Sequence, residues 1–122
     1  MASAGVQAEV TADRLNAAGT EAEAGNWLMV HKTYDSNRFS SLSEINASNV
    51  AGLHLAFAVP IGGMEPSAFG VGSMQTTPLV DNGFLYISDP WGTPYKFDLS
   101  DGKQAKLLWT CDTGIEKDVT AG

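Results

Sequence analysis

The fold of this chain is decided by the stretch TTPLVDNGFLYIS at residues 76–88. Two apolar runs of strand length flank Asp81-Asn82-Gly83, and Asp, Asn and Gly in this order favour a tight hairpin turn. Further apolar runs follow, and the last of them carries Trp109. The pattern predicts a meander of antiparallel strands at about 76–80, 84–88, 94–98 and 106–110. One such meander, closed by an aromatic residue, is typical of a β-propeller blade.

Charge and composition exclude several classes of protein. The chain has 122 residues, with 14 acidic against 7 basic side chains and a formal net charge of -7. This argues against nucleic acid or an anionic membrane surface as a partner, because both are negatively charged and attract positively charged proteins. No apolar run approaches the roughly 18 residues that a membrane span needs. Cys111 is the only cysteine, so an internal disulfide and a multi-cysteine metal site are excluded, and we expect a small buried side chain.

The first 25 residues differ in composition from the rest. Residues 1–25 are rich in Ala, Gly and Glu and have few large apolar side chains, so we expect a flexible arm with short helical turns. Thr11 is placed to cap a helix over residues 12–18, which Gly19 would end. Val6-Gln7-Ala8 has the small-residue spacing of a signal-peptidase site. It indicates a periplasmic or secreted protein.

Order is expected from residue 26 onward. Apolar and other residues alternate over residues 53–60, and this alternation predicts a half-buried strand of a neighbouring or closing blade. The longest loop follows at residues 61–75 and ends in Met74 and Gln75. Loops of this length in compact domains are often functional.

Three motifs occur in a fixed order along the chain. They are Asn26-Trp27 with Arg38-Phe39-Ser40 and Asn49-Val50, then Thr77-Pro78-Leu79-Val80-Asp81, and finally Phe97-Asp98 with Gly102-Lys103 and Trp109. Together they resemble the start of the quinoprotein alcohol dehydrogenases, periplasmic enzymes whose eight-bladed propeller surrounds pyrroloquinoline quinone (PQQ). The resemblance implies an all-β fold and a partial β-propeller of about one four-stranded blade plus part of a neighbour. Residues 26–122 would be its N-terminal portion, and residues 76–110 its first blade.

The resemblance also implies which residues face the cofactor. Many members of the family have a quinone-contacting Glu shortly before the Thr-Pro pair, and the matching residue here is Gln75. Gln75 is therefore the one predicted cofactor-binding residue, with Met74 beside it on the wall of the cofactor funnel. Phe57 stands where the family commonly has Trp, and the hairpin between Lys103 and Trp109 is longer than usual. Outer packing is expected from the three tryptophans, Trp27, Trp91 and Trp109.

We expect no catalytic and no metal-binding residue in this chain. In the family, the catalytic aspartate and the Ca²⁺ or lanthanide ligands come later in the sequence. Carboxylates in turns mostly accept backbone hydrogen bonds, and Ca²⁺ needs 6–8 converging oxygens. The carboxylates to which this applies are Glu65, Asp81, Asp89, Asp98, Asp101 and Asp112.

The resemblance implies an enzyme that oxidises a small alcohol with PQQ and Ca²⁺ or a lanthanide. A single blade leaves two sheet edges without a paired strand, and a propeller protects such edges only by arranging its blades in a closed ring. We therefore expect the chain alone to be incomplete and inactive. Its partner would be the remainder of the propeller, as a second polypeptide or a missing C-terminal part. The alternatives are a non-catalytic propeller scaffold with the same repeat, for protein assembly in the cell envelope, and a small secreted binding module. The long motif from Asn26 to Val50 favours the dehydrogenase.

Overall fold

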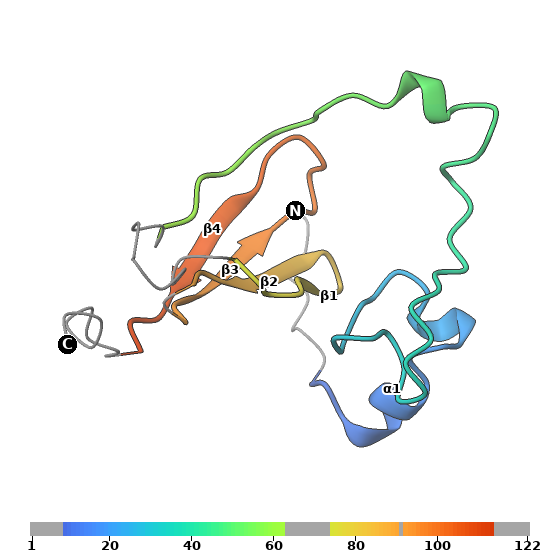
Figure 1. Ribbon diagram of the computed structural model, residues 1–122, viewed down its shortest axis with the longest axis horizontal. Coiled ribbons are helices and arrows are strands. Elements are labelled where there is room, and N and C mark those ends of the chain that lie inside the picture. The colour runs from blue at the N-terminus through green and yellow to red at the C-terminus, as the bar shows by residue number, and fades with distance from the viewer. Residues whose placement is uncertain (1–8, 63–73, 91, 114–122) are drawn as a thin grey trace, which may run out of the picture.

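The computed structural model describes residues 9–62, 74–90 and 92–113, and its centre is one four-stranded antiparallel sheet (Figure 1). The strands pair in chain order and have these bounds: β1 Leu79–Asp81, β2 Phe84–Ser88, β3 Pro94–Asp98 and β4 Lys106–Thr110. The predicted all-β meander is thereby confirmed. β1 begins later than predicted because Pro78, just before it, has no N–H to donate to a ladder.

The turn between β1 and β2 has the backbone that its sequence demands. Asp81 pairs with Phe84, so only two residues connect the strands. Both have positive φ, 48° at Asn82 and 83° at Gly83. Positive φ at both central positions defines the type I′ turn, whose twist matches that of the flanking strands. The Asn-Gly pair therefore fixes the register of this hairpin.

The connection between β3 and β4 is held by two aspartates. Asp98 Oδ1 accepts the Ser100 N–H at 2.9 Å. Asp101 Oδ1 accepts the N–H groups of Lys103 and Gln104 at 2.8 and 3.1 Å. The pKa of Asp98 is lowered first by the Ser100 side chain and then by the Ser100 N–H, and the pKa of Asp101 is lowered by the N–H groups of Lys103 and Gln104. The turn role predicted for these aspartates is confirmed.

β4 carries one residue more than β3 at their junction. Lys96 lies opposite Trp109 and Phe97 lies opposite Leu107, which leaves Leu108 without a partner in register. Such a bulge bends the strand and increases its twist. Phe97 is only 3% exposed, whereas every residue of β4 is exposed. Among the described residues, β4 is therefore a bare edge with uncovered apolar side chains.

An N-terminal layer lies on the β1 side of the sheet, away from β4 (Figure 1). Its helical turns are α1 Ala12–Asn16 and η1 Glu21–Glu23. A third short turn, η2 Val50–Gly52, lies apart from them on a long exposed excursion of the chain (Figure 1). Thr11 Oγ1 accepts the Arg14 N–H at 3.3 Å, as expected of a helix cap. Ala18 is 1% exposed. The expected flexible arm is thus, over residues 9–25, a folded segment that contributes to the core.

The N-terminal layer also covers part of an edge that we expected to be open. Trp27 N–H donates to the Val80 carbonyl at 2.8 Å, and Val80 N–H donates to the Trp27 carbonyl at 2.9 Å. This antiparallel bridge occupies the outer side of β1. The expectation of two open edges is therefore wrong at β1, where an edge-covering segment is a common protective device.

Residues 53–60 do not form the predicted half-buried strand. They run as an extended coil without ladder partners (Figure 1). Leu53 is 61% exposed, Leu55 80% and Val59 39%. Alternating apolar residues become a strand only when another strand lies alongside, and no described edge does so here. Their place in a neighbouring or closing blade stays a prediction.

Three smaller expectations have different outcomes. Cys111 is a free, exposed thiol, so its expected burial is wrong, because it follows directly on the uncovered β4. The possible processing site at Val6–Ala8 lies outside the described residues. Within the described ranges, no helix has the length and hydropathy to cross a bilayer.

Candidate functional site

Gln75, the predicted cofactor-binding residue, lies in the irregular segment that leads into β1. It is exposed, and its neighbour Met74 is 42% exposed. The Gln75 side chain makes no hydrogen bond with any residue that the structure describes. A primary amide offers two donors and one acceptor and carries no charge. That Gln75 contacts the cofactor stays a prediction.

The residue after Gln75 is tied to the blade. Thr76 Oγ1 donates to the carbonyl of Ser88 at 3.0 Å. Ser88 is the last residue of β2, so this bond fixes the entry to β1 against the end of the neighbouring strand.

A second polar cluster surrounds Asp89, directly after β2. Asp89 is 5% exposed. Its carboxylate accepts the Thr93 N–H and the Tyr95 hydroxyl, each at 3.0 Å. Tyr95 Oη in turn accepts the Gly62 N–H at 3.3 Å. Burial first, and then the bond to Asp89, raise the pKa of Tyr95, so the phenol stays protonated and able to donate.

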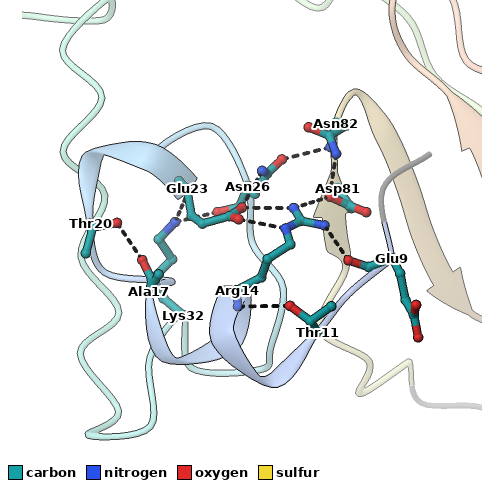
Figure 2. A network of polar contacts seen from close by, with 10 residues as sticks. All are labelled: Glu9, Thr11, Arg14, Ala17, Thr20, Glu23, Asn26, Lys32, Asp81 and Asn82. Carbon is teal, nitrogen blue, oxygen red and sulfur yellow. Dashed lines mark hydrogen bonds and ion pairs between the residues drawn. The ribbon is translucent and has the colours of Figure 1, made fainter. Parts of the chain in front are cut away.

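A charged network joins the N-terminal layer to β1 (Figure 2). The Arg14 guanidinium contacts Glu23 twice, Nε to Oε1 at 2.7 Å and Nη2 to Oε2 at 2.9 Å. Its Nη2 also donates to Asp81 Oδ1 at 2.7 Å. Glu23 is 7% exposed and Asp81 3%. The bond from Arg14 is the main cause of the lowered pKa of Glu23, and both carboxylates raise the pKa of Arg14.

Lys32 extends this network. Its side chain is buried, and its Nζ donates to the Glu23 carbonyl at 2.9 Å and to the Asn26 carbonyl (Figure 2). Burial lowers the pKa of Lys32, and the charge of Glu23 partly opposes that effect. Asn26 itself donates to Glu23 and accepts the Asn82 N–H at 2.8 Å. These groups satisfy one another, so the network connects the N-terminal layer to the sheet.

An apolar groove of about 380 Å³ lies where the N-terminal layer meets the sheet. It is lined by Val10, Leu28, Leu79, Val80, Asp81 and Tyr86. A ligand site needs converging polar groups as well as apolar walls, and the acidic group here, Asp81, is engaged by Arg14. The groove is separate from Gln75.

Residues 27–121 match the family model described as the glucose/ethanol/alcohol dehydrogenase β-propeller domain, PQQ. The match covers more than half of the chain. The chain belongs to the PQQ-dependent alcohol dehydrogenase family. The family resemblance drawn from the three motifs is confirmed.

Several relatives of this quinoprotein chain carry dehydrogenase names. It is 34% identical over 98 residues to quinohemoprotein alcohol dehydrogenase ADH IIB of Pseudomonas putida, covering 80% of this chain and 13% of that protein. It is 33% identical over 91 residues to the dehydrogenase subunit of the quinone-type alcohol dehydrogenase of Gluconacetobacter polyoxogenes, covering 75% and 11%. It is also 29% identical over 99 residues to the lanthanide-dependent methanol dehydrogenase of Methylacidiphilum fumariolicum, covering 75% and 16%. The chain therefore spans a small part of the length of each of these relatives.

Several carboxylates of this quinoprotein blade already accept hydrogen bonds from the backbone. Asp89, Asp98 and Asp101 accept backbone N–H groups, as predicted. Glu65 lies outside the described residues. In the ranges given above, no three His, Cys, Asp or Glu side chains gather in a way that could hold a metal ion. That the metal ligands of the enzyme lie outside this chain stays a prediction.

The tryptophans of the quinoprotein blade differ in their surroundings. Trp27 is half-buried and lies at the β1 edge, where the Lys32 ammonium is 5.8 Å from its ring centroid. Trp109 is 44% exposed on β4, so the packing partner expected for it is absent from the described residues. Trp91 lies outside them. The predicted outer packing is therefore visible for Trp27 alone.

Sequence reasoning missed the polar side chains that hold the blade and the N-terminal layer together. Thr76, Tyr95 and Arg14 carried no motif, and Asp81 and Asp89 were expected only to bond backbone in turns. The available signal for Asp89 was its position directly after an apolar strand and two residues before Trp91-Gly92. It could indicate a turn, but not the tyrosine and glycine that the turn brings together.

Proposed function

We propose that residues 76–110 form the first blade of a PQQ-dependent enzyme that oxidises a small alcohol. The proposal rests on the position of Gln75 in a chain that belongs to this family. Its side-chain amide, which bonds to no residue that the structure describes, lies in the segment leading into β1, at the position where many members have a quinone-contacting carboxylate. The rest of the blade supplies the support, because β1 to β4 form one continuous sheet.

The residues near Gln75 fit a quinone cofactor. When bound, the quinone supplies the two-electron acceptor for alcohol oxidation. The Gln75 amide would hydrogen-bond to polar atoms of the cofactor without adding a negative charge, and Met74 would supply apolar wall. No catalytic residue is assigned to this chain.

We propose that the metal ion of the complete enzyme, Ca²⁺ or a lanthanide, is held by residues beyond this chain. Support comes from the hydrogen bonds of Asp89, Asp98 and Asp101, which already use oxygens that a cation would need. The lanthanide option is supported by the printed name of the Methylacidiphilum relative.

The proposed partner is the remainder of the propeller, as a second polypeptide or as a C-terminal part. The open β4, the uncovered side chains of residues 53–60 and the greater length of the relatives support this partner. We propose that the chain alone is inactive and that the complete protein is periplasmic or secreted. The scaffold alternative is not favoured, because the matching relatives are named as dehydrogenases.

Quinone retention in the complete protein tests the proposal. Gln75→Ala is expected to weaken PQQ binding about 2- to 10-fold, the range that the loss of one hydrogen bond produces. Gln104→Ala, in the exposed turn before β4, is the matched control and should bind PQQ normally. Unchanged binding by Gln75→Ala would remove this residue from the cofactor site. A complete protein that binds no PQQ would refute the function itself and favour the scaffold.

A further inference from the structure

Two hydroxyl groups tie both ends of one long connection to the same end of β2. At the C-terminal end of the connection, the Thr76 hydroxyl donates to the Ser88 carbonyl. At its N-terminal end, the Gly62 N–H donates to Tyr95 Oη, and the Tyr95 hydroxyl donates to Asp89 Oδ2. Ser88 and Asp89 are consecutive residues. Residues 62 and 76 are thus fixed against one point of the blade.

Asp89, the acceptor at this point, is also bonded to the turn that follows it. Asp89 N–H donates to the Thr93 carbonyl at 3.0 Å, and its own carbonyl accepts the Gly92 N–H at 3.0 Å. Its carboxylate also accepts the Thr93 N–H. A buried carboxylate with several donors has one orientation, and a hydrogen bond to it is stronger than one between neutral groups. Asp89 therefore presents a fixed oxygen to the Tyr95 hydroxyl.

Gly62 fits this arrangement because it has no side chain. A Cβ at position 62 would lie 3.1 Å from Tyr95 Oη. That separation is tighter than ordinary contact, so a larger residue would push Gly62 or the tyrosine ring away. The close approach lets the backbone itself donate to the phenol.

We propose that Thr76 and Tyr95 are positioning residues for Gln75. The proposal rests on the proposed role of Gln75 at the quinone. The peptide between residues 75 and 76 is planar, which places their Cα atoms 3.8 Å apart. Restraining Thr76 therefore restrains the origin of the Gln75 side chain. Tyr95 acts at the same point of the blade, because its hydroxyl donates to Asp89, the residue directly after the Ser88 to which Thr76 is bonded.

Matched variants in the complete protein separate positioning from general stability. Thr76→Val removes the donor and keeps the shape, whereas Thr76→Ser keeps the hydroxyl. Thr77→Val is the control, because Thr77 is exposed and makes no side-chain hydrogen bond to a described residue. Tyr95→Phe is matched by Tyr34→Phe, since Tyr34 is 68% exposed.

The expected result is a selective loss of PQQ binding. Thr76→Val and Tyr95→Phe should each weaken PQQ binding about 2- to 10-fold, while Thr76→Ser and both control variants bind as the parent does. Amide hydrogen exchange without quinone should rise several-fold at residues 74–77 in Thr76→Val and at residue 62 in Tyr95→Phe. Exchange within β2 to β4 should stay unchanged. Equal binding by Thr76→Val and the parent, or a uniform rise in exchange across the sheet, overturns the proposal.

A double-variant cycle tests whether the anchors act through Gln75. If they do, adding Thr76→Val to Gln75→Ala weakens PQQ binding no further, because the side chain being positioned is gone. Fully additive losses overturn the positioning role while leaving the proposed function intact. A parent protein that retains no PQQ overturns the proposed function, and the positioning role with it.

Discussion

Arg14 and Asp81 are 67 positions apart in the chain, and Arg14 Nη2 donates to Asp81 Oδ1 across 2.7 Å. Asp81 ends β1, and Arg14 lies in α1. The guanidinium also binds Glu23, so one cation joins the first helix, the following 3-10 turn and the first strand. Both carboxylates are buried, which makes the loss of any partner costly.

Glu23→Gln is expected to lower the free energy of unfolding of the chain by about 1–3 kcal/mol. The substituted amide would turn an N–H₂ toward Arg14 or Asn26, both of which already donate to Glu23. Urea unfolding measures the change. Glu21→Gln, in the same 3-10 turn but exposed, should stay within about 0.5 kcal/mol. Equal effects of the two substitutions would contradict the role given to Glu23.

The same carboxylate predicts a pH dependence of stability. Arg14 lowers the pKa of Glu23 below its ordinary value of 4.5, so the unfolded chain takes up this proton at a higher pH than the folded chain. The stabilisation is therefore complete above about pH 4.5 and is lost as the pH falls through the folded pKa. Asp98 and Asp101, whose pKa values are also lowered, add a background that the parent and Glu23→Gln share. The difference in unfolding free energy between parent and variant should shrink on acidification; a constant difference would show that Glu23 does not titrate this way.

Gly83→Ala is expected to cost about 1–2 kcal/mol through the backbone alone. Gly83 has φ of 83°, and the nearest heavy atom to an added Cβ would be Ser100 Cβ at 3.9 Å. An added Cβ therefore has enough space, but alanine adopts this left-handed backbone conformation only at an energetic cost. Gly25→Ala is the control, because nothing lies within 4 Å of its added Cβ and its φ is not positive. Thermal unfolding of both variants measures the cost, and similar melting temperatures would rule out the turn as its source.

Leu55→Ala tests whether residues 53–60 belong to a neighbouring blade. In the chain alone Leu55 is 80% exposed, so its truncation should change stability by less than about 0.5 kcal/mol. In the complete propeller, burial as a strand would raise the cost to about 2–5 kcal/mol. Phe97→Ala, at a residue that is 3% exposed, should be costly in both settings. A small effect of Leu55→Ala in the complete protein would exclude the closing strand.

The local part of the fold was predictable because it depends on neighbours in sequence. Asn82-Gly83 supports a type I′ turn wherever it occurs between strands, and the apolar runs around it then have one register. Residues 53–60 show the limit of the same reasoning. Their alternation is strand-like, but a strand needs a second strand beside it, and the described chain provides none.

The sequence by itself determined the four-strand meander, its first turn and, through three motifs, the family to which Gln75 owes its predicted role. Only the tertiary structure decided that Arg14 binds Asp81, that Trp27 covers β1, and that the hydroxyls of Thr76 and Tyr95 bond to Ser88 and Asp89. The physical reason is the distance along the chain over which each interaction acts. Turn and strand preferences act over a few residues, whereas a buried ion pair or a shared hydroxyl forms only after folding has brought distant residues within about 3 Å of each other.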